Sequence, residues 1–146
     1  MPSDELQLSP AVHDAITTYC AEGDELAEAG KYEEAIAVYR EAWSLIPEPK
    51  TDWNAATWVI AALADAYFLG GYIQYAKEAL DFGMGCPGAI GNPFLHMRYG
   101  QALLDMGDED RAADELMRAY MSEGDEIFET EDPRYLSFLK TRAIIP

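Results

Sequence analysis

Basic residues are scarce in this sequence. Only 10 of its 146 residues are lysine or arginine, whereas 27 are aspartate or glutamate, and the formal net charge is −17. Proteins bind nucleic acids and anionic membranes through cationic surfaces, so the composition argues against both as direct partners. A strongly acidic surface instead favours a basic protein partner and fast association that weakens with salt.

Cysteine and histidine are scarce as well. Cys20 and Cys86 have neither metal-ligand nor redox spacing, so we expect reduced, structural cysteines. His13 and His96 lie on expected helices without a carboxylate or cysteine at ligand spacing, which predicts surface or hydrogen-bonded histidines. No nucleophile elbow, phosphate loop or zinc motif is present. The sequence therefore predicts no enzyme, no metal site and no cofactor.

Two short segments could suggest a ligand site, and both have a simpler interpretation. Residues 83–88 have the glycine spacing of a dinucleotide fingerprint, but they follow an amphipathic helical pattern, and the fingerprint works only after a strand. Residues 108–110 are acidic but lack the alternating oxygen ligands and central glycine of a calcium loop. We expect an inter-helix loop at the first and a helix N-terminus at the second.

Long apolar runs are also missing. The longest, residues 55–64, is too short to span a bilayer, and the first residues lack the cationic segment and apolar run of a secretory signal. We therefore expect a cytoplasmic protein that does not bind membranes. A hydrophobic content of 49% still suffices for a packed core, and the length suits one domain.

The sequence does contain a pattern of small and large residues that occurs three times. In the first copy, Gly23, Ala35 and Ala42 are small while their neighbours are large and apolar. Two helices joined by a short turn pack antiparallel, and their close approach requires small residues at the crossing. Ala76 and Ala112 repeat the position of Ala35, with separations of 41 and 36 residues.

This pattern resembles the tetratricopeptide repeat. The residues of the first copy that carry the resemblance are Tyr19, Gly23, Leu26, Gly30, Tyr32, Ala35, Tyr39, Ala42 and Pro47, with a departure at Glu22, where the family prefers leucine. The resemblance implies an all-α fold, a right-handed α-solenoid of three helical hairpins with a C-terminal capping helix. We expect a single domain over residues 1–146, with repeats at about 16–49, 57–90 and 93–126 and a capping helix at about 133–142.

Caps and breakers locate the helix ends. Ser9-Pro10 and Asn92-Pro93 predict helix starts, and Asp108 is expected to cap a further helix. Thr51 or Asp52 is expected to cap the helix at residues 53–69, which is apolar on nearly all sides. The acidic residues 123–132 are expected to form a loop.

The resemblance also implies where a partner binds. In this family, the first helix of each repeat lines a concave groove that holds a peptide or protein element. The matching positions combine aromatic and apolar anchors with carboxylates, and the expected contact residues are Asp24, Glu28, Trp58, Asp65, Phe68, Phe94, Met97, Gln101 and Asp105. Such a surface suits a basic, partly apolar segment. The alternative is that the chain's own terminal helices cover the three aromatic side chains.

One branch of the family does not fit. Co-chaperones that hold the acidic C-terminus of heat-shock chaperones use a groove clamp of lysine, asparagine and arginine. The matching positions here are Cys20, Asp24, Ala61, Ala62 and Phe94, and only the neighbouring Arg98 retains a cation. The sequence therefore argues against that role.

The leading interpretation is a binding protein without catalysis, and within that class a bacterial immunity protein or antitoxin. Toxins that act on nucleic acids or nucleotides are often basic, so an acidic inhibitor can occupy their site. Two alternatives stay open: a secretion chaperone that holds an extended segment, and a scaffold that forms homodimers through residues 53–69.

Overall fold

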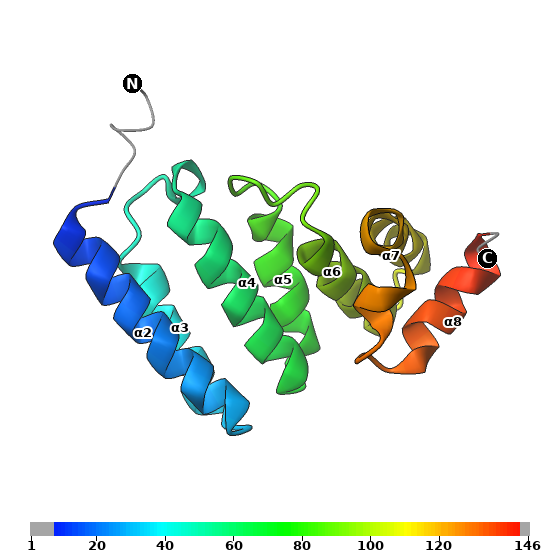
Figure 1. Cartoon of the computed structure of the whole chain (residues 1–146), viewed down its shortest axis with the longest axis horizontal. Helices are drawn as coiled ribbons and strands as arrows, with labels where there is room; N and C mark the ends of the chain where they lie inside the picture. Colours follow the sequence, from blue (N-terminus) through cyan, green and yellow to red (C-terminus); the bar gives the residue numbers. More distant parts are fainter. Residues whose placement is uncertain (1–7, 144–146) are drawn as a thin grey trace. The chain divides into compact units, whose positions relative to one another are not determined.

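The computed structural model describes residues 8–143, and the regular secondary structure of this part of the chain consists of helices (Figure 1). The α-helices are α2 (Pro10–Glu28), α3 (Tyr32–Ser44), α4 (Asn54–Leu69), α5 (Ile73–Gly83), α6 (Pro93–Asp105), α7 (Glu109–Glu123) and α8 (Pro133–Arg142). Two 3-10 helices, η1 (Lys50–Asp52) and η2 (Gly124–Phe128), lie between them. The all-α prediction is confirmed, and the predicted capping helix is α8. The chain start, for which no secretory signal is predicted, lies outside the described residues.

Three tight turns of the same build join α2 to α3, α4 to α5 and α6 to α7. In each turn a glycine adopts a positive φ, namely 77° at Gly30, 89° at Gly71 and 88° at Gly107. The next backbone N–H donates to a carbonyl five residues earlier, from Lys31 to Leu26 (2.9 Å), Tyr72 to Tyr67 (2.8 Å) and Asp108 to Leu103 (2.9 Å). This left-handed glycine termination ends each first helix and returns the chain antiparallel. The internal repeat is therefore visible in the backbone.

Small residues lie at the crossing of each helix pair. Ala35, Ala76 and Ala112 are completely buried. Two glycines are packed more tightly still, since a Cβ atom on Gly23 would lie 2.4 Å from the ring of Tyr39, and one on Gly100 would lie 2.7 Å from Cγ of Leu116. The predicted close approach at the crossings is confirmed.

The chain divides into two compact units, one ending at Ala89 and the other starting at Ile90. In the first unit, α4 packs against α3 and α5 and also contacts α2 (Figure 1). In the second unit, α6 pairs with α7, and η2 and α8 pack on α7. The prediction of a single domain stays a prediction.

The predicted cap of α4 is wrong, whereas three other caps are confirmed. The side chains of Ser9, Asn92 and Asp108 accept from the backbone N–H three residues later, at 3.3, 3.2 and 3.4 Å. Thr51 and Asp52 instead belong to η1, and α4 begins after Trp53 without a side-chain cap. The cause is Lys50, whose ammonium donates to the carbonyls of Trp43 (2.9 Å) and Ile46 (2.7 Å) and so holds this turn against the end of α3.

The predicted acidic loop is also corrected. Residues 124–128 form η2, and the ring of Phe128 is only 5% exposed. The high charge of the segment obscured one buried aromatic side chain, which anchors it to the second unit.

We predict that Gly100→Ala destabilises the protein, because its new methyl group would meet Cγ of Leu116 at 2.7 Å and the backbone nitrogen of the same residue at 3.0 Å. Overpacking should outweigh the better helix propensity of alanine and lower the free energy of unfolding by roughly 1–2 kcal/mol in urea denaturation. The control is Gly85→Ala, where the methyl group meets its nearest atom at 3.5 Å and the change should stay within about 0.5 kcal/mol. A Gly100→Ala variant as stable as the wild type would contradict the tight crossing.

Candidate protein-binding surface

Five of the nine predicted contact residues belong to the first unit, where α2 and α4 are in contact. Asp24 and Glu28 are exposed on α2, whereas Trp58, Asp65 and Phe68 lie on α4, with Trp58 exposed and the other two half-buried. We call these five residues the α2–α4 surface.

Carboxylates from both helices converge on the phenol of Tyr39. Its hydroxyl donates to Oδ1 of Asp24 at 2.5 Å, and the charge of Asp65 also acts on it. Burial, the bond to Asp24 and these two negative charges raise the pKa of Tyr39 well above its usual range. The phenol therefore stays neutral and orients Asp24, while the surrounding electrostatic potential remains negative.

Trp58 is open in this structure. Its side chain is 41% exposed, and the edge of its ring contacts His13 with ring centroids 5.9 Å apart. Both residues line a hollow of about 470 Å³, together with Leu8, Pro10, Asp14, Trp53, Asn54 and Ala55. The aromatic anchor predicted on α4 is thus accessible, and the sequence reasoning missed the neighbours that shape the hollow beside it.

In the second unit, two of the predicted contact residues of α6, Gln101 and Asp105, bond to the chain's own C-terminal segment. Gln101 is completely buried, and its amide donates to Oε1 of Glu131 at 2.9 Å. Arg98 donates to the same oxygen at 2.7 Å, and its guanidinium lies 5.1 Å from the ring centroid of Phe94. Glu131, a residue of the expected loop, is therefore the partner of the one cation retained in the predicted groove.

The C-terminal segment also neutralises Asp105. This carboxylate pairs with the guanidinium of Arg134 at 2.7 Å and accepts from the hydroxyl of Tyr135 at 2.8 Å. Met97 is buried and Phe94 is half-buried. Partner contacts at Phe94, Met97, Gln101 and Asp105 stay a prediction. A partner that contacts Gln101 or Asp105 directly would have to replace the bonds that these two side chains form within the chain. No residue spacing in the sequence indicates the contacts to Arg134 and Tyr135.

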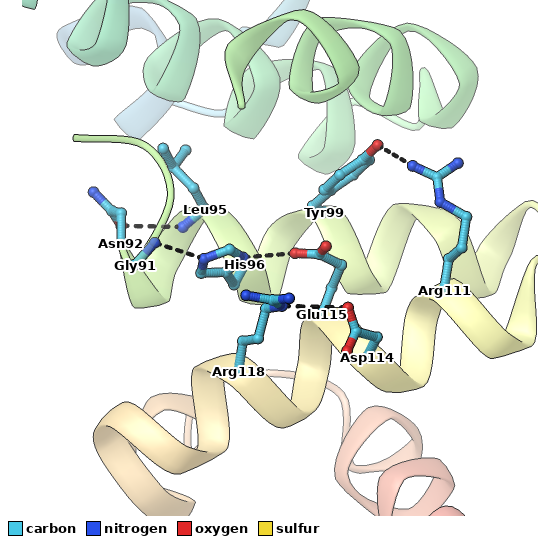
Figure 2. A network of polar contacts seen from close by, with 9 residues as sticks. All are labelled: Gly91, Asn92, Leu95, His96, Tyr99, Arg111, Asp114, Glu115 and Arg118. Carbon is cyan, nitrogen blue, oxygen red and sulfur yellow. Dashed lines mark hydrogen bonds and ion pairs between the residues drawn. The ribbon is translucent and has the colours of Figure 1, made fainter. Parts of the chain in front are cut away.

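Polar contacts join α6 to α7 within the second unit, and His96 is central to them (Figure 2). Its Nε2 accepts from the backbone N–H of Gly91 at 2.8 Å, and its Nδ1 lies 2.6 Å from Oε1 of Glu115. A backbone amide only donates, so Nε2 is unprotonated and Nδ1 donates to Glu115. His96 is buried between these partners, which confirms the prediction of a hydrogen-bonded helical histidine.

Clusters of three metal-ligating side chains and helices with the length and hydropathy to cross a membrane are both absent from residues 8–143. Burial, followed by the charge of Asp24, raises the pKa of Cys20 to about 11, and burial raises the pKa of Cys86. A thiol with a raised pKa is a weak nucleophile at neutral pH.

Comparison with known proteins agrees with this geometry. Residues 16–49 match the family model described as Tetratricopeptide repeat. The structure is similar to the TPR domain of Arabidopsis OM64, with a TM-score of 0.70 and 17% identity over 90% of this chain and 99% of that chain. A comparison with curated proteins gives no match.

Two similar structures contain a bound peptide. The first TPR domain of Spaghetti (RPAP3) bound to an HSP90 peptide has a TM-score of 0.65 and 16% identity, covering 88% of this chain and 90% of that chain. The Yersinia enterocolitica type III secretion chaperone SycD, in complex with a peptide of the translocator YopD, has a TM-score of 0.68 and 18% identity, covering 88% and 92%. This chain thus has the fold of tetratricopeptide-repeat proteins, and its residues 16–49 form such a repeat, as the sequence resemblance predicts.

We predict that Glu131→Ala destabilises the protein strongly. The side chains of Arg98 and Glu131 are only 6% and 15% exposed, so the change removes a carboxylate that neutralises a buried guanidinium. The free energy of unfolding should fall by about 3 kcal/mol. Glu129→Ala is the control, because this exposed glutamate in the same segment should change stability by less than about 0.5 kcal/mol. Equal stability of the two variants would show that the pair contributes little.

Alkylation of Cys20 by iodoacetamide should be slow. A Cys86→Ser background removes the second thiol, so the reaction of Cys20 can be followed alone. A pKa of about 11 instead of 9.0 leaves about a hundredfold less thiolate at pH 8, and the rate should still be rising above pH 10. Asp24→Asn removes a negative charge, lowers the pKa and should accelerate the reaction at fixed pH, whereas Asp14→Asn, exposed on the same helix, should not. If Cys20 in the Cys86→Ser background were alkylated at pH 8 as fast as the thiol of an unstructured peptide, the raised pKa of Cys20 would be contradicted.

Proposed function

We propose that this chain is a non-catalytic protein-interaction module that binds a basic, partly apolar segment of a protein partner on the α2–α4 surface. The observation that carries the proposal is the combination of an exposed tryptophan with carboxylates on two contacting helices. Asp24 and Glu28 form no ion pair within residues 8–143, so their charges are available to a cationic partner. In the second unit, half-buried Phe94 is proposed as a separate contact, whereas Met97 is only 2% exposed.

The similar structures support binding of an extended segment. The Spaghetti domain is bound to an HSP90 peptide and SycD to a peptide of a translocator, so the same fold can hold peptide segments in two different proteins. Similarity of fold alone does not identify a partner, so the kind of partner has to be inferred from the chemistry of the α2–α4 surface.

The partner is proposed to be basic for electrostatic reasons. The net charge of −17 repels nucleic acid and anionic membranes and accelerates encounter with a cationic protein. An acidic C-terminal peptide, which the co-chaperone branch of the family holds, would find Arg98 already engaged by Glu131. This contact supports the exclusion of that branch.

Within this class, an immunity protein or antitoxin that neutralises a basic bacterial toxin in the cytoplasm is the favoured function. Its support is the acid surplus together with an aromatic anchor, the combination that suits occupation of a cationic active site. A secretion chaperone is the second candidate, and the similarity to SycD favours it. A homodimeric scaffold that associates through α4 is the third.

The first test is affinity capture of the tagged full chain from its own cells at low and high salt, with mass spectrometry of the retained proteins. We expect one dominant basic protein in stoichiometric amount, retained less at high salt. Its identity separates toxin from secreted substrate. Retention of no partner, or of many weak ones, would contradict the proposal, and a dominant copy of the chain itself would support the scaffold.

Trp58→Ala should weaken binding of the captured partner by about 2 kcal/mol, roughly thirtyfold, in isothermal titration calorimetry, because an exposed tryptophan in a contact surface is a typical hot spot. Met121→Ala is the control, since this side chain is 79% exposed on α7 and outside the surface. Unchanged affinity of a folded Trp58→Ala variant would exclude the α2–α4 surface as the contact.

Charge neutralisation tests the electrostatic half of the proposal. The combined changes Asp24→Asn, Glu28→Gln and Asp65→Asn should slow association about tenfold at low salt and affect dissociation less. The matched control removes three charges elsewhere, by Glu25→Gln, Glu41→Gln and Asp52→Asn. Equal slowing by both sets would assign the effect to net charge rather than to this surface.

A further inference from the structure

The first unit has a second hollow surface, on a different side of α4. Two adjoining hollows of about 440 and 350 Å³ share Arg40, Tyr67 and Tyr75 as lining residues. Their floor is formed by α4 and their walls by α3 and α5. We call this the α3–α5 groove, and its further lining includes Ile36, Trp43, Ile60, Leu63, Tyr72 and Phe82.

The helical period separates this groove from the α2–α4 surface. Ile60, Leu63 and Tyr67 are spaced by three and four residues and therefore lie on one face of α4. Trp58 and Asp65 lie on the opposite face by the same rule, and Phe68 lies to the side between the two faces. One helix thus contributes to two surfaces, and a partner on one leaves the other open.

Aromatic side chains dominate the groove. Trp43 and Phe82 meet edge to face with centroids 5.6 Å apart, and Tyr67 stacks on Tyr75 at 5.5 Å. Phe82 is 45% exposed and Tyr75 is 58% exposed. Contiguous exposed rings of this kind are typical of protein-contact surfaces rather than of ordinary solvent-facing helices.

Arg40 gives the groove a positive charge that the protein does not use itself. The other five arginines of the chain form ion pairs with its carboxylates. Arg40 has neither an ion pair nor a hydrogen bond within residues 8–143, although acidic residues exceed basic ones 27 to 10. It lies near the phenol of Tyr67, where its charge opposes the rise in pKa that burial causes.

The carboxylates at the rim are engaged by other groups. Glu33 accepts a hydrogen bond from the hydroxyl of Tyr72, and Glu78 accepts one from the amide of Gln74 at 3.0 Å. Glu48 lies 3.7 Å from the ammonium of Lys50, the second cation of the groove. The charge in the groove that lacks a counter-ion is therefore that of Arg40.

We propose that the α3–α5 groove binds a protein segment in which one carboxylate side chain is flanked by aromatic or aliphatic residues, with the carboxylate on Arg40. A guanidinium can donate two parallel hydrogen bonds to a carboxylate, and the rings beside it can bury apolar flanking side chains. This ligand has the opposite charge to the partner of the α2–α4 surface, so the two sites select different segments.

The test uses two short probes, the peptide acetyl-Leu-Phe-Glu-Leu-amide and its twin with glutamine in place of glutamate. Each is titrated into the isotope-labelled full chain and followed by heteronuclear NMR. We expect the glutamate peptide to bind in the millimolar range, to shift the indole N–H signal of Trp43, and to bind about tenfold more tightly than its twin. Arg40→Gln should abolish the difference, whereas Arg118→Gln, which alters an exposed arginine of α7, should retain it.

Three results would overturn the proposal: no binding of the glutamate peptide, equal binding of the two peptides, or shifts confined to other parts of the chain. Light scattering of the free protein at the same concentration tests another occupant. Dimerisation that Arg40→Glu abolishes would assign the groove to a second copy of the chain and likewise overturn the proposal. A monomer that discriminates between the peptides through Arg40 supports it.

Discussion

The close crossing of paired helices is the constraint on which the rest of the structure depends. Where Gly23 meets Tyr39 and Gly100 meets Leu116, no room remains for a Cβ atom, so the rotation of each helix about its own axis is restricted by its partner. Once this rotation is set, the helical period determines which side chains point away from the crossing. The surfaces available for recognition are therefore a consequence of packing between the helices.

Much of the fold could be predicted from the sequence because its determinants are local. The turn glycines, the caps at Ser9, Asn92 and Asp108, and the buried alanines all act within one hairpin, and their recurrence makes the pattern readable. The cap predicted for α4 at Thr51 or Asp52 is wrong because this turn depends on Lys50, which reaches back to carbonyls at the end of α3. This side-chain contact between Lys50 and the end of α3 overrides the preference for a threonine or aspartate cap.

The candidate site was predictable only in part, because contacts between residues distant in the sequence determine which of its side chains are exposed or paired. The resemblance to the repeat family implied Trp58, Asp65 and Phe68 as contact residues on α4, but burial and pairing depend on distant residues. Glu131 lies 33 residues after Arg98, and a count of charges treats it as a solvent-exposed acid. Nothing in local spacing distinguishes this glutamate from Glu129, although one is bonded in the interior and the other is exposed.

The arginines of this protein differ in whether they neutralise a carboxylate of the chain itself. Arg98 and Arg134 compensate carboxylates that packing has partly removed from water, where an unpaired charge would be costly. Arg40 has no such task, because the aromatic rings around it carry no formal charge and the rim carboxylates have other partners. Arg40 is exposed to solvent, whereas Arg98 is only 5% exposed. The difference explains why the same residue type stabilises the fold on α6 and remains free for recognition on α3.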